Sequence, residues 1–176
     1  LGQAAALSCM VADLTLGKEK WKSGWEIAEK TQECAIGMFG RALDLATDDS
    51  RSFDAVMMTY KLAKGSDEEK EIRRQAIREA TLGAAEVPLE TARLAHSLLK
   101  HLPELAKKGN VNTVSDIGVA SLLASAACKG ALFNVEINVS SLPEEMGSSL
   151  KDEAASILES SRILSRACMD AVRERL

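Results

Sequence analysis

The polar residues best placed to do chemistry lie in one long apolar segment, residues 109–139. Asp116 and Asn134 are 18 residues apart, which is about five turns of an α-helix with ~3.6 residues per turn, and Asn138 follows one turn later. All three therefore lie on one side of the predicted helix. Because buried polar side chains need hydrogen-bond partners, an acid at one end and two amides at the other indicate either a structural network or a bound ligand.

One small ligand cannot contact both ends of this row. At a rise of about 1.5 Å per residue, Asp116 and Asn134 are roughly 27 Å apart along a straight helix. Either the ligand is long, or two copies of the chain meet antiparallel and bring opposite ends together, as in a two-fold dimer. The segment is also rich in Gly, Ala and Ser, which allows close backbone approach. We therefore place it in the middle of a helical bundle.

Each of these polar residues also has a purely structural interpretation. Thr113 and Asp116 have the spacing of a capping box, in which the two side chains close the first turn of a helix. This role is compatible with a functional one for Asp116. The amides of Asn134 and Asn138 could instead join neighbouring helices.

Two further polar positions could take part in a site. Asp49 lies in residues 47–50, Thr-Asp-Asp-Ser, which we expect to end one helix and begin the next. It is an ordinary N-cap there, or a candidate acid/base group if it faces a cleft.

Lys18 follows Gly17, which we expect to end the first helix. Lysines complement the dipole at a helix C-terminus, or they form an anion site for a ligand that carries a carboxylate.

The cysteines and histidines show no metal-binding or redox pattern. The four cysteines are isolated, with no CxxC motif, and are interpreted as small core residues of a reduced, cytoplasmic protein. His96 and His101 have no metal-binding spacing with an acid or a cysteine, so we expect structural or solvated roles.

Composition limits the class of protein. The chain has 176 residues, 46% of them hydrophobic and only 3% aromatic, enough for one domain with a substantial core. The net charge of −4 argues against nucleic-acid binding. We identify no uninterrupted apolar run of the ~18 residues that a membrane span needs, and no membrane association is expected. The chain begins within a helical pattern, so we expect N-terminal sequence to be missing, which weakens conclusions about targeting.

The whole chain, residues 1–176, is predicted to be one all-α domain, a bundle of five to six long helices. Ser66 and Glu69 form a capping box at the start of the longest helix, and a kink or restart is expected near Pro88 because proline disfavours helix in the preceding residue. The predicted helices cover residues 3–16, 26–45, 50–63, 67–109, 113–139 and 144–174.

Five segments together resemble a known family: MVADLTLGKEKW (10–21), DDSRSFDAVM (48–57), EVPLETA (86–92), GNVNTVSDIGVA (109–120) and NVEINV (134–139). The chain resembles the formiminotetrahydrofolate cyclodeaminases, a family that includes single-domain methenyltetrahydrofolate cyclohydrolases. The resemblance implies an all-α bundle that forms dimers or larger oligomers, with folate bound near subunit interfaces. A glycine-rich turn that precedes the first helix in the family is absent from this sequence. The implied site residues are Lys18, Asp49, Asn112, Asp116, Asn134 and Asn138.

The reaction implied by the resemblance is a ring closure. N10 of 5-formiminotetrahydrofolate attacks the formimino carbon, ammonia leaves, and the cationic 5,10-methenyl bridge remains. A carboxylate can accept the N10 proton, protonate the departing ammonia and stabilise the cation. Asp116 is the first candidate and Asp49 the second. Asn134 and Asn138 would bind the pterin or the bridge, and Lys18 the glutamate tail.

No metal and no cofactor beyond tetrahydrofolate is expected. The alternatives are a cyclohydrolase, in which water opens the same bridge, and a non-catalytic helical oligomer.

Overall fold

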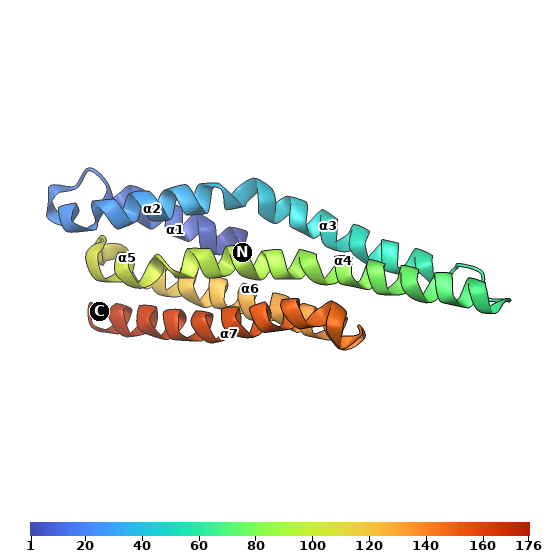
Figure 1. The fold of residues 1–176 in the computed structure, drawn as a ribbon. Helices are drawn as coiled ribbons and strands as arrows, with labels where there is room; N and C mark the ends of the chain where they lie inside the picture. The colour runs from blue at the N-terminus through green and yellow to red at the C-terminus, as the bar shows by residue number, and fades with distance from the viewer.

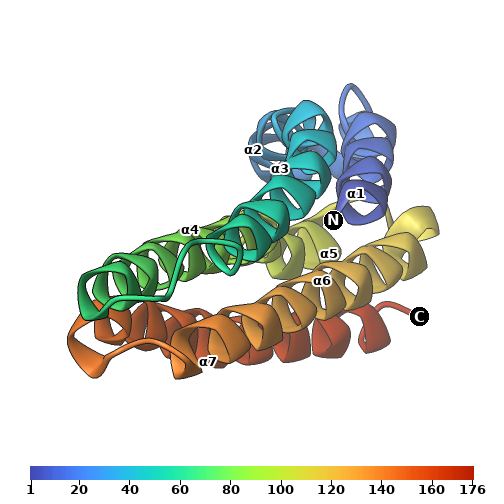
Figure 2. The same cartoon turned by 90° about the vertical axis from the view of Figure 1, so that its right-hand side faces the viewer.

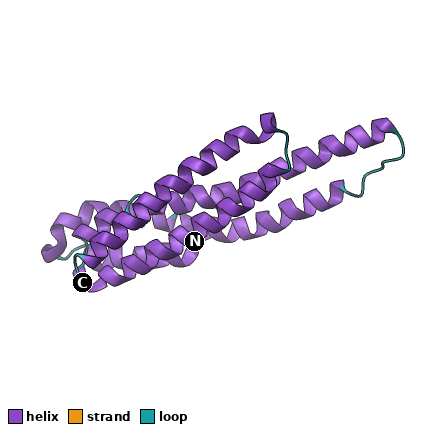
Figure 3. Ribbon diagram, turned by 90° about the horizontal axis from the view of Figure 1, so that it is seen from below, coloured by secondary structure: helices purple, strands orange, loops and turns teal.

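The computed structural model describes all 176 residues and contains only helices (Figure 3). The predicted all-α bundle is confirmed. Long helices are joined by short connections, and two short 3-10 helices, η1 and η2, precede α2 and α6. The elements are α1 (Gly2–Thr15), η1 (Glu19–Gly24), α2 (Trp25–Ile36), α3 (Met38–Thr59), α4 (Asp67–Leu99), α5 (Leu102–Lys108), η2 (Val111–Thr113), α6 (Val114–Ser140) and α7 (Glu144–Arg173).

Helices α4, α6 and α7 run side by side and form the body of the bundle (Figure 1). Helices α1 and α2 cover the end that contains α5, and α3 continues from α2 along α4 (Figure 2). Together, α3 and the N-terminal part of α4 project beyond α6 and α7 (Figure 1). The core has two parts, one around α1, α2 and α5 and the other between the middle of α4, α6 and α7.

The predicted break at residues 47–50 is wrong, because α3 continues through them. The polar side chains bond inside the helix instead of ending it. Arg41 donates from Nη1 to Asp48 Oδ2 at 2.8 Å, and Ser50 Oγ donates to the carbonyl of Ala46. The chain breaks earlier, at Gly37, where α2 ends and α3 begins. Asp49 is therefore inside a helix and is not an N-cap.

Of the predicted kink or restart near Pro88, the restart does not occur, since α4 runs unbroken from Asp67 to Leu99. A proline inside a helix removes the N–H that would bond to the carbonyl four residues earlier, here that of Ala84. This carbonyl accepts a hydrogen bond from Asn138 Nδ2 of α6 at 3.0 Å. The lost bond is thus replaced from a neighbouring helix, which allows α4 to continue. The predicted capping box of Ser66 and Glu69 forms.

Helix α6 lies in the long apolar segment that the sequence predicts as a central helix. With η2, it is long and apolar enough to cross a membrane by length and composition alone. In the fold it packs against α4, α7 and α1. A core helix of a bundle passes the same test of length and composition.

Candidate functional site

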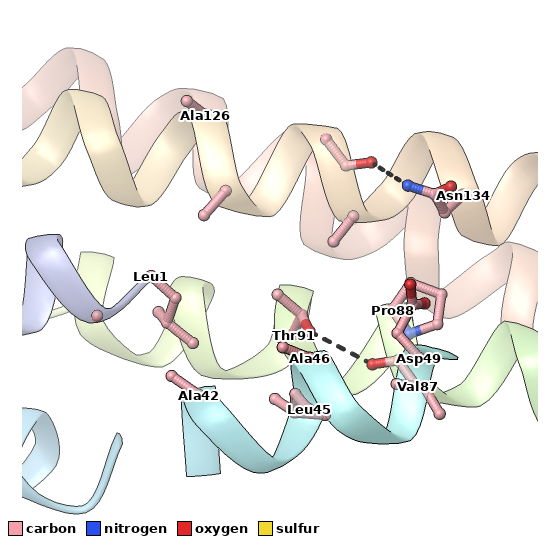
Figure 4. Close-up of a pocket in the computed structure, with 14 residues that line it drawn as sticks. Leu1, Ala42, Leu45, Ala46, Asp49, Val87, Pro88, Thr91, Ala126 and Asn134 are labelled. Carbon is pink, nitrogen blue, oxygen red and sulfur yellow. Dashed lines mark hydrogen bonds between the residues drawn. The ribbon is translucent and has the colours of Figure 1, made fainter. Parts of the chain in front are cut away.

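A groove of about 410 Å³ lies between α3, α4, α6 and the first residues of α1 (Figure 4). Its walls consist mostly of small and apolar side chains. The polar members are the Asp49 carboxylate from α3, the Thr91 hydroxyl from α4 and the Asn134 amide from α6. The lining residues are Leu1, Gly2, Ala42, Leu45, Ala46, Asp49, Val87, Pro88, Thr91, Ala126, Ala127, Gly130, Ala131 and Asn134.

Two neighbouring aspartates of α3 have different surroundings. Asp48 is half-buried and paired with Arg41. Asp49 is exposed, lines the groove, and forms no ion pair or side-chain hydrogen bond. Successive residues of a helix point about 100° apart, which is why only one of the two reaches the groove. A carboxylate without a partner remains able to accept a proton from a bound molecule.

The two asparagines at the end of α6 also differ. Asn134 is exposed and lines the groove. Its Nδ2 donates to the Gly130 carbonyl at 3.1 Å, so its oxygen remains available as an acceptor. Asn138 is not among the lining residues and gives its Nδ2 to the Ala84 carbonyl. This bond supports the helix-joining role that the sequence left open for Asn138.

The other three predicted site residues lie at the opposite end of α6. Lys18 is exposed just before η1, Asn112 is exposed in η2, and Asp116 is in the first turn of α6. Asn110 connects these segments, because its Nδ2 donates to the Leu14 carbonyl at 3.0 Å. None of these residues lines the groove that contains Asp49 and Asn134.

The predicted capping box of Thr113 and Asp116 does not form, because no side chain caps the first turn of α6. The Thr113 hydroxyl donates to the Asn110 carbonyl at 3.0 Å instead. Asp116 is thus free of the structural role that competed with a functional one.

An apolar face of α6 connects the two ends. Large apolar side chains recur on it at helical spacing and are 47–67% exposed. Small residues, Ala126 and Gly130, lie exposed between them. Contiguous apolar surface of this kind marks interaction sites. The large side chains are Val119, Leu122, Phe133 and Ile137.

Two of the four thiols are buried, and one of the two imidazoles lies beside a serine hydroxyl. Burial raises the pKa of the Cys168 thiol to about 11 and also raises the pKa of Cys128, so neither is a ready thiolate nucleophile. Burial lowers the pKa of His96, whose Nε2 is 2.8 Å from Ser160 Oγ. No group of three His, Cys, Asp or Glu side chains is arranged to hold a metal ion.

Comparison with known proteins identifies the family. Residues 2–156 match the model of the formiminotransferase-cyclodeaminase family. The chain belongs to this family. It is 38% identical over 140 residues to a methenyltetrahydrofolate cyclohydrolase of Methylorubrum extorquens, covering 80% of this chain and 67% of the relative. It is 34% identical to the formimidoyltransferase-cyclodeaminase of Gallus gallus, covering 80% of this chain and 26% of the relative.

The fold comparison agrees. A crystal structure of formiminotetrahydrofolate cyclodeaminase from Thermotoga maritima matches with a TM-score of 0.77 at 28% identity, covering 99% of this chain and 82% of that one. The predicted resemblance is thereby confirmed, and the relatives carry the names of both predicted enzyme activities. The chain spans about a quarter of the length of the Gallus gallus protein.

The five family-like segments separate into two groups in the fold. Segments 48–57, 86–92 and 134–139 each contribute to the groove. Segments 10–21 and 109–120 meet at the other end of α6, where Asn110 bonds to Leu14. The predicted site residues therefore lie in two groups, which we call the groove half-site (Asp49, Asn134) and the end half-site (Lys18, Asn112, Asp116).

Sequence reasoning missed several groove residues. Thr91 and Gly130 line it, and a fork of hydrogen bonds from Arg41 to Glu90 lies beside it. The pattern of one helix does not show which neighbour it faces. The segment at 86–92 was the available signal, since it contains both Pro88 and Thr91.

Proposed function

We propose that this chain is a formimidoyltetrahydrofolate cyclodeaminase, which closes 5-formiminotetrahydrofolate to the 5,10-methenyl form and releases ammonia. One observation carries the proposal: an unpartnered carboxylate and an available amide oxygen line one groove whose walls come from three of the family-like segments. The fold relative named as a cyclodeaminase, which covers 99% of this chain, supports it. A second candidate is the cyclohydrolase, which the relative that is 38% identical favours.

The chemistry requires one well-placed carboxylate at a time. In the cyclodeaminase, N10 bonds to the carbon of the protonated, cationic formimino group and loses its proton to a carboxylate. That proton then goes to the departing nitrogen, the carbon–nitrogen bond breaks, and ammonia leaves. In the cyclohydrolase, water adds to the methenyl carbon, a carboxylate takes its proton, and the bond to N5 breaks to give 10-formyltetrahydrofolate. Both routes need only proton transfer, and no cofactor beyond the folate.

The two half-sites complete one site if two copies of the chain pair through α6. The apolar face is symmetric about Ala126, because Val119 and Phe133 are each seven residues from it, and Leu122 and Gly130 are each four. A two-fold axis at the exposed Ala126 would therefore superpose the face on itself with α6 antiparallel. It would bring the end half-site of one copy to the groove half-site of its partner.

In this arrangement Asp49 and Asn134 of one copy share a pocket with Asp116, Asn112 and Lys18 from the other. The two carboxylates then have separate positions around the substrate, as acid/base chemistry at two nitrogens requires. Lys18 is available for the glutamate tail, because it forms no ion pair within its own chain. The pairing would also cover the exposed apolar face, as expected of a homodimer interface.

Assays with two substrates test the activity. The purified protein is incubated with 5-formiminotetrahydrofolate and, separately, with 5,10-methenyltetrahydrofolate, and the methenyl absorbance is followed. A cyclodeaminase produces the absorbance from the first substrate together with ammonia. A cyclohydrolase removes the absorbance from the second faster than buffer does and does not release ammonia from the first. No change in either reaction, with no binding of a reduced folate, would favour the non-catalytic oligomer.

The pairing is tested by Phe133→Glu, which places a charge on the apolar face. Light scattering should show a dimer for the wild type and a monomer for the variant. The variant should also lose folate turnover, because the groove half-site of one copy no longer meets the end half-site of another. Ile72→Glu is the matched control, since Ile72 is 59% exposed and Phe133 57%, but Ile72 lies on the projecting part of α4. A wild-type monomer that turns over folate would exclude the shared pocket.

A further inference from the structure

Helix α4 forms two matching ion-pair forks, one to each neighbour. On one side Arg41 of α3 donates from Nε and Nη2 to both Glu90 oxygens, each at 2.7 Å. On the other side Arg93 of α4 donates from Nε and Nη2 to both Glu153 oxygens of α7, each at 2.6 Å. The side chains are similarly half-exposed, at 35% for Arg41 and 42% for Arg93. Such forks fix orientation as well as distance.

The two forks act in very different surroundings. Helix α7 is held to the body by seven buried residues, but α3 has only two, Met38 and Leu45, among its 22. Near the groove, the fork from Arg41 to Glu90 adds a polar contact between α3 and α4. Arg41 also donates from Nη1 to Asp48 at 2.8 Å, so a single guanidinium joins two turns of α3 to α4.

The fork and the groove lie on different flanks of α3. Arg41 and Asp48 are seven residues apart, about two turns, and share one flank, whereas Asp49 is turned about 100° away. The buried Leu45 lies between these directions and contributes to the groove wall. A rotation of α3 on α4 about Leu45 would move Asp49, and the fork from Arg41 to Glu90 opposes such a rotation.

We propose that Arg41 is a positioning residue. Its hydrogen bonds to Glu90 and Asp48 fix the rotation of α3 relative to α4, and this rotation directs the Asp49 carboxylate into the groove. The effect on turnover rests on the proposed function, but the effect on α3 does not. Arg41 does not line the groove and acts through Asp49. The pKa of Glu90 is lowered chiefly by the hydrogen bonds from Arg41, which agrees with a formed ion pair at neutral pH.

The test compares Arg41→Gln with the matched Arg93→Gln. In Arg41→Gln, the hydrogen-exchange rate of the α3 amides should rise about tenfold or more. The reason is that a helix with few buried residues depends on each remaining contact to resist local unfolding. Turnover (kcat) should fall about tenfold with a smaller change in KM, as expected when a reacting group is misplaced. In Arg93→Gln both quantities should stay within about twofold of wild type, because exposed ion pairs contribute little where burial is extensive.

Two more variants make the result specific. Arg41→Lys keeps the charge but cannot form the fork, so it should recover only part of the kcat. Glu90→Gln removes the partner and should repeat the Arg41→Gln effects, which keeps the inference testable if Arg41→Gln does not fold. Equal behaviour of the Arg41 and Arg93 variants in both measurements would overturn the inference. A wild-type protein inactive on folate would instead contradict the proposed function, while the hydrogen-exchange comparison still decides the role of Arg41.

Discussion

Helices α3 and α7 flank the same helix, α4, but they are attached to it in opposite ways. Helix α7 is buried along its length, at Leu150, Ile157 and Cys168 among others. Helix α3 has a mainly exposed surface, and it forms one wall of the groove. Helix α3 thus has far fewer buried residues than α7, and the groove lies beside it. Functional segments are commonly drawn from the less stable parts of a fold.

The largest stability effect should come from the buried body. Leu98 in α4 is 0% exposed, and Leu98→Ala should lower the free energy of unfolding by about 2–5 kcal/mol in urea denaturation, because it leaves a cavity. Leu45→Ala in α3 should cost less, because solvent lies close to α3, but should lower folate turnover in the protein that remains folded. Equal stability losses would show that α3 is as firmly packed as the body.

The contact of α4 with α6 can be tested at Pro88. Asn138→Ala removes the donor to the Ala84 carbonyl, and an unsatisfied buried acceptor costs about 1–3 kcal/mol. In a Pro88→Ala background, residue 88 regains an N–H for that carbonyl, so Asn138→Ala should cost markedly less. A double-mutant cycle in urea measures this coupling. Additive effects would mean that the two residues act independently.

A smaller effect is expected at Gly130, on the α6 wall of the groove. A Cβ there would meet no atom within 4 Å, and alanine favours helix over glycine by about 0.5–1 kcal/mol. Gly130→Ala should therefore raise the melting temperature slightly but lower folate turnover, because in the proposed site a substrate or a second copy of the chain would approach the helix there. Gly24→Ala is the contrast, since its Cβ would lie 2.5 Å from the Lys108 carbonyl oxygen and should destabilise the protein. Unchanged turnover in Gly130→Ala would show that nothing approaches this position closely.

The smallest effect should appear in acid. Hydrogen bonds from arginine lower the pKa of both Glu90 and Glu153 below their ordinary value of 4.5. A lowered carboxyl pKa contributes stability that is fully present above the ordinary value and is lost as pH falls through the lowered one. Between pH 5 and pH 3 (about the range that brackets carboxyl titration), α3 amides should lose protection before α7 amides. Simultaneous loss would indicate that the two helices are attached equally.

The helices were predictable because their signals are local. Helical periodicity predicted the all-α class, and the Ser66–Glu69 capping box predicted the start of the longest helix. The helix predicted at 144–174 matches α7 to within one residue. A helix break was predicted at residues 47–50 because the sequence does not show that α3 and α4 meet there. In the fold, Arg41 bonds to Glu90 of α4 and also to Asp48, so the polar residues 47–50 stay within α3. Periodicity also placed Asp116 and Asn134 on one side of α6. Only the neighbouring helices show that Asn134 faces the groove and that Asn138 donates to the Ala84 carbonyl, which Pro88 leaves without its usual partner.

Mixing two inactive variants tests most directly whether one site is built from two copies. Asp49→Asn and Asp116→Asn should each lower turnover at least about tenfold, with circular dichroism and oligomer size unchanged. After unfolding and refolding together in equal amounts, half of the dimers combine both variants, and each of these has one site with neither change. We predict recovery of about a quarter of wild-type activity. If the mixture is no more active than either variant alone, the two half-sites do not meet across a dimer.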